Sequence, residues 1–422
     1  MDTTIERIDR HPIEVPYRPV TERNMDRELP HWRYLEILEV ELADGSVGYG
    51  ETLLFYTWGE TTDEDVERAH GERATSIMWD DSLGAGLQIA LFDAVGKAVG
   101  CPITDLLGGR VHDETPVSWW CIDMPGEDWV TEARRARELG YRNIKLKARP
   151  WFDLDAQLEA LDDALPASFA VDLDYNGTLL DAERGLPHLE SIVEYPQVTH
   201  IEGPIPQEDV EGNASITEAL DVPVALHYGR PEPITALCET MCDGFVVSGG
   251  ASQLRDTAAV ASMAEKPFWL QLVGTGITAA FALHCGGAFK QATWPAITCR
   301  EIYEHELLEE RIEVEDGYAE VPTDPGLGYE VDMDAVERFR CEKPEEQPNP
   351  PRLIEANWPE GPTIYFAENE TNFMITYARE EGMPYFAAGA HTWLVPDHGS
   401  DRWEELHEGA REEPVVHDEP VF

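Results

Sequence analysis

From Val117 onward the chain alternates short apolar strands with amphipathic helices, and this alternation limits the fold more than any other feature of the sequence. Eight candidate strands recur, each followed by a helical stretch. Such a succession predicts a closed parallel (βα)8-type, TIM-like barrel. The alternative, an open doubly wound sheet, is disfavoured because no GxGxxG or P-loop motif follows the early strands. The candidate strands are 117–122, 143–147, 169–173, 199–202, 222–226, 244–247, 268–272 and 292–297.

The segments on either side of the barrel pattern look different. Residues 5–15 and 34–51 alternate as strands, and Asp44-Gly45 within the second segment predicts a hairpin turn. Residues 62–108 are expected to be helical, with the clearest apolar face over 82–100. We therefore predict an α/β fold in four parts. These are an N-terminal α+β capping (lid) domain over 1–115, the barrel over 116–310, a return segment packing toward the cap over 311–345, and a C-terminal extension of unknown role over 346–422.

Charge excludes some classes of partner. The chain has 83 acidic and 31 basic residues, and its formal net charge is -52. Such a charge repels nucleic acid and anionic membranes, so neither is an expected partner. Because the acids are spread along the whole chain, we interpret them as adaptation to a salt-rich cytoplasm, and predict a halophile's protein. Its exposed barrel helices favour a homo-oligomer.

The sequence contains neither a signal-peptide pattern nor an apolar stretch long enough to span a membrane. The seven cysteines lack CxxC pairs, which is typical of ordinary thiols in a reducing compartment. Together these features predict a cytoplasmic location.

Charged side chains stand at the ends of three successive candidate strands. Lys145 and Lys147 end one strand, Asp172 and Asp174 end the next, and Glu202 ends the third. Residues i and i+2 of a strand face the same way, and the carboxyl ends of barrel strands carry the reactive groups of such enzymes. We therefore expect these side chains to meet in one mouth.

The combination suits removal of a proton from a carbon next to a carboxylate. That step creates a dianionic enolate, and a divalent cation held by carboxylates can stabilise it. A lysine whose pKa is lowered by neighbouring positive charge can act as the base. In this arrangement Lys145 lowers the pKa of Lys147 and also binds a substrate oxygen. A small carboxylate is the expected substrate.

Seven motifs resemble the enolase superfamily, in its mandelate racemase and muconate lactonising enzyme branch, and they span about residues 4–340. They are GYGE (48–51), IALFDAVGKAVGCPITDLLGG (89–109), KLK (145–147), VDLD (171–174), IEGP (201–204), SGGAS (248–252) and DPGLGYEVD (324–332). The resemblance implies that Lys147 is the base, that Lys145 is its partner, and that Asp172 and Glu202 bind a metal, normally magnesium. It also implies that the N-terminal domain is a lid that selects the substrate, with candidate contacts at Tyr17, Arg18, Glu22, Phe55, Tyr56 and Trp58.

The fifth strand departs from the family pattern, because His227 stands where an acidic metal ligand is expected. Histidine binds magnesium poorly but suits manganese, zinc or iron. Two interpretations stay open: His227 is a ligand, or it only forms hydrogen bonds in the pocket. Asp174, where the family commonly has asparagine, could supply the missing carboxylate.

A second base is also missing, since strand six offers only Ser248 and strand seven ends near Gln271, both candidate substrate contacts. A racemase generally needs bases on both faces of the carbon, whereas a syn elimination can use one lysine. We therefore predict dehydration of a hydroxy or sugar acid. The alternatives are a racemase, epimerase or cycloisomerase of the same superfamily, and a barrel that has lost its metal and binds a small acid without turning it over.

Overall fold

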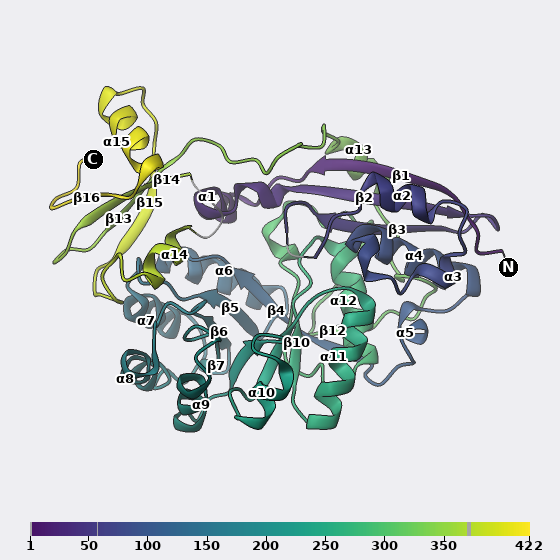
Figure 1. The fold of residues 1–422 in the computed structure, drawn as a ribbon, viewed down its shortest axis with the longest axis horizontal. Coiled ribbons are helices and arrows are strands. Elements are labelled where there is room, and N and C mark those ends of the chain that lie inside the picture. Colours follow the sequence, from purple (N-terminus) through teal and green to yellow (C-terminus); the bar gives the residue numbers. More distant parts are fainter. Residues whose placement is uncertain (1, 57, 369–372) are drawn as a thin grey trace.

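The computed structural model describes residues 2–56, 58–368 and 373–422. Figure 1 shows three parts in chain order: a cap formed by the N-terminal strands and helices, a barrel, and a C-terminal module that comprises the described residues from Leu353 onward. A long extended segment leads from the cap to the module (Figure 1). The predicted fold class, a (βα)8-type barrel with a capping domain and a C-terminal extension, is confirmed.

The cap is a three-stranded antiparallel sheet covered by helix α4 (Ala85–Val99). The helix packs so closely on the third strand that a Cβ atom at Gly48 would lie 2.2 Å from the carbonyl oxygen of Ala90, and Gly50 is restricted in the same way. The glycines of the GYGE motif are therefore required by packing. The strands are β1 (Ile5–Glu14), β2 (Tyr34–Leu42) and β3 (Val47–Leu53).

The region expected to be helical over 62–108 contains several short helices and α4. Gly71, Gly84 and Gly100 interrupt it, with φ angles of +82°, +80° and +80°. Glycine adopts these left-handed angles without steric cost, so each one ends or separates a helix. The other cap helices are α1 (Pro19–Glu28), α2 (Asp63–Ala69), α3 (Ala74–Ile77) and α5 (Ile103–Leu106), with 3-10 turns at Pro30–Arg33 and Asp81–Leu83.

The barrel wall consists of eight parallel strands that neighbour one another in chain order, with β11 beside β4. A parallel bridge between Gln271 and Ile297 joins the two ends of the sheet. The strands are β4 (Glu114–Cys121), β5 (Asn143–Lys147), β6 (Ala170–Asp174), β7 (Val198–Glu202), β8 (Val224–His227), β9 (Gly244–Val247), β10 (Phe268–Leu270) and β11 (Ala296–Ile297). The helices are α6 (Gly126–Glu138), α7 (Leu154–Ala164), α8 (Ala182–Ile192), α9 (Val210–Ala219), α10 (Pro233–Cys238), α11 (Ala251–Ala264) and α12 (Gly276–Ala288), with a 3-10 turn at Arg300–Ile302.

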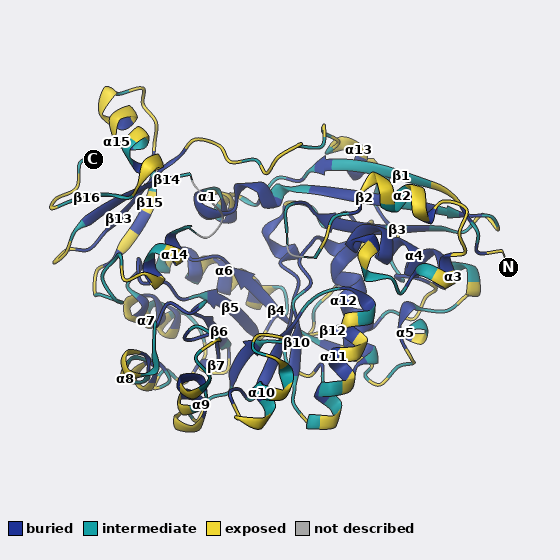
Figure 2. Ribbon diagram, in the orientation of Figure 1, coloured by how far each residue is buried: buried dark blue, intermediate teal, exposed yellow. Residues whose placement is uncertain are grey.

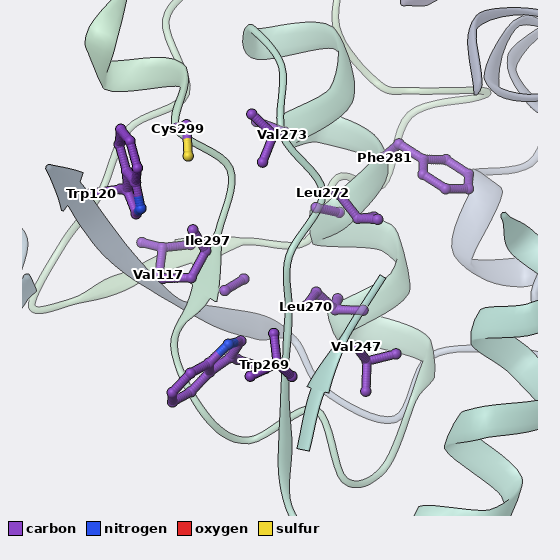
Figure 3. Close-up of a cluster of buried hydrophobic side chains, with 14 of the residues drawn as sticks. Val117, Trp120, Val247, Trp269, Leu270, Leu272, Val273, Phe281, Ile297 and Cys299 are labelled. Carbon is purple, nitrogen blue, oxygen red and sulfur yellow. The ribbon is translucent and has the colours of Figure 1, made fainter. Parts of the chain in front are cut away.

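Alternation along the strands separates the barrel interior from the helix layer. Trp269 and Leu270 extend in opposite directions from β10 (Figure 3). Trp269 lies inside, where its ring centroid is 5.0 Å from Lys145 Nζ. Successive strand residues point to opposite faces, so the interior side chains come from every second position.

The segment after the barrel returns to the cap. Strand β12 (Tyr318–Glu320) pairs antiparallel with β4, and helix α13 (Met333–Arg338) contacts β1. The backbone N–H of Cys341 donates to the carbonyl oxygen of Pro12 at 3.0 Å. The chain therefore crosses the cap again before it enters the C-terminal module.

The C-terminal module is an antiparallel sheet with strand order β15-β13-β14-β16 and two helices. Trp151 and Phe152, from the loop after β5, are buried among module side chains such as Ile354 and Phe366. The module is therefore held against the carboxyl end of a barrel strand. Its elements are β13 (Leu353–Asn357), β14 (Thr363–Ala367), α14 (Phe373–Arg379), β15 (His391–Val395), α15 (Asp401–Glu412) and β16 (Val415–His417).

Burial follows this layering. Figure 2 shows buried residues along the strands and exposed residues on the outer faces of the helices. No helix in the described part of the chain is long and apolar enough to cross a membrane. All seven cysteines are free thiols, as the lack of CxxC pairs indicates.

Candidate active site

Most of the reactive groups predicted from the sequence meet at the carboxyl ends of β5, β6 and β7, and Asp172 is the exception. Strand register places Lys147 beside Asp174, and Asp174 beside Glu202. A cavity of about 470 Å³ opens there. It is lined by Tyr56, Asp174, Asn176, Gly177, Glu202, Gly203, Ile205, Pro206, Gln207, Glu208, His227, Tyr228, Arg230, Ser248, Gln253, Gln271 and Arg379.

Two lysines and two carboxylates pair at the floor of this cavity. Lys147 Nζ lies 2.5 Å from Asp174 Oδ2, while Lys145 Nζ pairs with Glu202 and lies 3.8 Å from Asp174 Oδ2. Lys145, Asp174 and Glu202 are buried. Because buried charges need partners of opposite sign, this pairing stabilises these three groups in the interior.

The pairing sets the pKa values of two of these groups. Burial favours the neutral form of Asp174, but Lys147, Lys145 and Arg149 outweigh it and hold the pKa of that carboxyl well below its usual range. Burial would lower the pKa of Lys145, yet Glu202 and Asp174 raise it above the ordinary value. The two carboxylates therefore stabilise the charged form of Lys145.

The structure does not bring Asp172 to the cavity. This residue lies two positions before the end of β6, and its Oδ1 accepts hydrogen bonds from Thr199 Oγ1 at 2.8 Å and His200 Nδ1 at 2.7 Å. The His200 ring packs edge-on against Trp294. Asp172, predicted as a metal ligand, thus belongs to a deeper polar layer inside the barrel, and Asp174 occupies the mouth.

His227 lies at the mouth beside Glu202. Its Nε2 is 3.2 Å from Glu202 Oε1, and its side chain is 37% exposed. Gln207 holds its backbone, donating to the His227 carbonyl and accepting from the His227 N–H, each at 3.1 Å. The imidazole can therefore reach both the solvent in the cavity and the Glu202 carboxylate.

The donor set at the mouth fits a divalent cation. Both oxygens of Glu202 are buried and accept no hydrogen bond of good geometry, although Lys145 and His227 lie near them. Such unsatisfied acceptors are costly unless a cation or donor reaches them. The described residues contain no group of three His, Cys, Asp or Glu side chains arranged around one metal position. The lysine ammonium groups stand beside the carboxylates instead.

Three of the predicted substrate contacts line the cavity. Tyr56 reaches it from the loop after β3, with its ring edge-on to Trp32 at a centroid distance of 5.0 Å. Ser248 and Gln271 reach it from the ends of β9 and β10, and Gln271 Oε1 accepts from Lys145 Nζ at 3.2 Å. The cap and the barrel thus both contribute to the wall.

The early-loop candidates Tyr17, Arg18 and Glu22 do not line the cavity. Tyr17 is buried, and its hydroxyl donates to the Leu29 carbonyl at 2.7 Å. Arg18 pairs with Glu132 on α6. Glu22 is exposed on α1. Tyr17 therefore stabilises the cap internally, whereas Arg18 links the cap to the barrel.

Phe55 and Trp58 also lie outside the cavity wall. Phe55 has a left-handed φ of +60°, and its N–H donates to Glu60 Oε1 at 2.8 Å. The Trp58 ring packs toward Phe281 of α12, with a centroid distance of 6.3 Å. Of these three aromatic residues, only Tyr56 lines the cavity.

Sequence reasoning missed several residues of the site. Asn176 accepts hydrogen bonds from Lys147 Nζ at 3.2 Å and Arg149 Nη2 at 2.7 Å, and its N–H donates to Asp174 Oδ1 at 2.9 Å. Its position two residues after Asp174 was a usable signal. Arg379 lies more than 200 residues further along the chain, in the C-terminal module, and no motif indicated it.

Known proteins share this architecture. A family model described as enolase C-terminal domain-like matches residues 128–335. N-succinylamino acid racemase of Thermus thermophilus is 30% identical over 271 residues, which cover 60% of this chain and 70% of the racemase. The chain belongs to the enolase superfamily. Its branch is that of mandelate racemase and muconate lactonising enzyme, as the motifs predicted.

Relatives within the superfamily differ in reaction. Arabinonate dehydratase of Saccharolobus solfataricus is 24% identical over 340 residues, covering 72% of this chain and 90% of the dehydratase. The crystal structure of muconate cycloisomerase from Pseudomonas fluorescens matches with a TM-score of 0.66 and 23% identity, covering 81% of this chain and 100% of that one. The relatives thus include a racemase, a dehydratase and a cycloisomerase. The family-model match ends before the C-terminal module.

Proposed function

We propose that this protein dehydrates a hydroxy or sugar acid. It removes the proton from the carbon next to the carboxylate of that acid and then eliminates water from the same molecule. The observation that carries the proposal is the register of Lys147, Asp174 and Glu202 at one level of the barrel mouth. This arrangement combines an ammonium able to lose its proton with carboxylates able to hold a cation.

Lys147 is the proposed base. Its Nζ stands between Asp174 and Asn176, and its side chain is 14% exposed beside the cavity, whereas Lys145 is buried beneath Glu202. A base must be within hydrogen-bond reach of the proton it removes, so the lysine nearer the cavity suits that role. Lys145 is the proposed partner of Lys147, and it orients Glu202 and Gln271.

Asp174 and Glu202 are the proposed ligands of a divalent cation, with His227 as a third. Superfamily enzymes bind such a cation, typically magnesium. With Asp174 as the first ligand, the asparagine common two residues later in the family is present as Asn176. The cation supplies stabilisation of the negative charge that develops on the substrate carboxylate. A nitrogen ligand favours manganese over magnesium at this site.

The absence of a second lysine favours elimination over racemisation. Strands β9 and β10 contribute Ser248 and Gln271 to the cavity, and neither side chain is a base at neutral pH. A syn elimination can use Lys147 first as base and then as acid. The second candidate, a racemase or epimerase, is favoured by the similarity to N-succinylamino acid racemase, and it requires another proton donor, for which His227 is available.

The test is α-proton exchange in D2O with a panel of hydroxy and sugar acids, measured by NMR alongside product formation. Lys147→Ala should reduce exchange and dehydration by about a thousandfold, the order expected for loss of a positioned base. Lys290→Ala changes an exposed lysine far from the cavity and serves as the matched control. Full activity of Lys147→Ala on a confirmed substrate would contradict the assignment of Lys147 as the base. Exchange without water loss would favour the racemase, and failure of the wild type to bind any divalent cation would favour a binding protein.

A further inference from the structure

The C-terminal module reaches into the cavity through the last residue of α14. Arg379 lines the cavity, and its Nε donates to the carbonyl oxygen of Asn176 at 2.8 Å, with Nη2 donating to the same oxygen. Asn176 is the residue whose side chain contacts Lys147. The module is therefore in contact with the loop that carries the mouth of the site.

The position of Arg379 is fixed by packing between the module and the barrel. Trp358 Nε1 donates to the Pro150 carbonyl at 3.1 Å, and the Phe386 ring lies 4.6 Å from the His188 ring. Trp151 of the barrel is fully buried within the module core. Buried aromatic contacts of this kind stabilise an interface strongly, so α14 has a defined place beside the cavity.

Charge at the outer part of the cavity is unusual for this chain. Arg379 and Arg230 both line it, and neither has a carboxylate within 4.0 Å among the described residues. Glu208 is the acid of the outer wall, while Asp174 and Glu202 are already paired with the two lysines. The outer cavity thus keeps a positive excess in a protein whose net charge is -52.

Arg379 retains hydrogen-bond donors for a ligand. A guanidinium has five N–H groups in a planar fork, and only Nε and Nη2 contact the Asn176 carbonyl. The remaining donors on Nη1 match the oxygens of a carboxylate or a phosphate. A cavity of about 470 Å³ is in the range that holds a small ligand.

We propose that the C-terminal module forms part of the substrate site, in which Arg379, together with Arg230, binds a second anionic group at the end of the substrate away from the reacting carbon. This inference rests on the proposed function for the position of the reacting end. The preferred substrate is then a dianionic acid, with a carboxylate or a phosphate at its far end.

The test measures binding by isothermal titration calorimetry on the manganese-loaded full-length protein, at a salt concentration where it is folded. The probes are gluconate, glucarate and 6-phosphogluconate, with galactonate and galactarate as a second stereochemical series. The wild type should bind a dianionic probe about tenfold more tightly than its monoanionic partner, as expected for a charge-assisted contact. Preference for glucarate or galactarate identifies a carboxylate as the distal group, and preference for 6-phosphogluconate identifies a phosphate.

Arg379→Gln should reduce this preference to about twofold or less while changing the binding of the monoanionic probe by no more than about threefold. Arg184→Gln is the matched control, because Arg184 pairs with Glu381 of the module but does not line the cavity. It should keep the wild-type preference.

Three outcomes overturn the inference: no preference for a dianion in the wild type, equal weakening of both probes by Arg379→Gln, or no binding of any probe in either series. Affinity and product formation are measured separately, so the two proposals can fail separately. A dianion preference that depends on Arg379, without product from any acid, would reject only the proposed function. Dehydration that is indifferent to Arg379 and to the second charge would reject only the inference.

Discussion

Two buried carboxyl groups, one where the cap meets the barrel and one at the barrel mouth, have opposite pKa shifts. Glu51 of β3 accepts hydrogen bonds from Thr275, which precedes α12, and from Thr278 within it, and burial raises its pKa to about 7. Asp174 is equally buried, but its neighbouring cations outweigh burial and lower its pKa. Burial alone therefore favours a neutral acid, and surrounding cations keep the mouth ionised.

A third carboxyl group refines this comparison. Asp172 lies two residues from Asp174 on the same strand and face, yet its partners are Thr199 and His200 inside the barrel. One strand thus carries a structural carboxylate and a candidate functional one. Depth along the strand separates them, because only the last residues reach the cavity.

The largest expected effect separates the two aspartates by activity. Asp174→Asn should lower kcat/KM by about a thousandfold, because it removes a ligand of the charge-stabilising cation. Asp172→Asn should cost less than about tenfold, because this carboxylate does not line the cavity. Steady-state kinetics on the best acid from the panel, with manganese affinity measured in parallel, distinguishes them. A greater loss of manganese affinity in Asp172→Asn than in Asp174→Asn would restore Asp172 as the ligand.

The second largest expected effect is on stability, and it concerns Asp172 in the polar layer inside the barrel. Asp172→Ala leaves the partly buried His200 without its charged partner, and should lower the free energy of unfolding by about 3 kcal/mol. Chemical denaturation at constant salt measures the change. Asp163→Ala, at an exposed position on α7, is the control and should change the free energy by less than about 0.5 kcal/mol. Equal stability of Asp172→Ala and the control would contradict the assignment of Asp172 to the core.

The raised pKa of Glu51 predicts that the free energy of unfolding depends on pH, by an amount similar to or smaller than the effect of Asp172→Ala. Its folded pKa of about 7 lies above the ordinary value of 4.5, so the folded state binds the proton more tightly. The resulting contribution is fully present below about pH 4.5 and is lost as pH rises through about 7, by at most about 3 kcal/mol. Glu51→Gln should therefore be less sensitive to pH between 5 and 8 than the wild type in denaturation experiments. Parallel curves for the two proteins would contradict this pKa.

The smallest expected effect concerns the exposed acids rather than the buried ones. If the acidic surface is an adaptation to salt, raising potassium chloride from about 0.1 M to about 2 M should raise Tm by about 2 °C, since salt screens surface repulsion. Activity differences between Asp172→Asn and Asp174→Asn should persist at both concentrations, because those groups are buried. An unchanged Tm would argue against halophilic adaptation.

Much of the fold could be predicted because it depends on local pattern. The strands at 143–147, 199–202 and 244–247 were predicted within a residue, since apolar runs bounded by turn residues form strands wherever they fall in a barrel. The helical region 62–108 was less accurate, because its interruptions depend on glycines that adopt left-handed angles in the folded chain.

The site was predicted unevenly for a related reason. Lys147, Glu202 and His227 stand at strand ends, so chain position alone indicated that they meet. Asp172 and Asp174 were both predicted as candidate ligands, because the sequence shows that the two share a face but not which one reaches the cavity. Tyr17 and Arg18 were misplaced because loop residues have no periodicity from which to infer direction.

The sequence by itself determined the barrel, its cap and the strand-end position of the reactive groups, because hydrophobic periodicity and strand order are written in neighbouring residues. Only the tertiary structure decided that Asp174 lies at the mouth while Asp172 is buried deeper in the barrel. The register between strands depends on contacts across the whole barrel. It alone also brought Arg379 to the cavity. Contacts between residues some 200 positions apart follow from packing, and no local pattern encodes them.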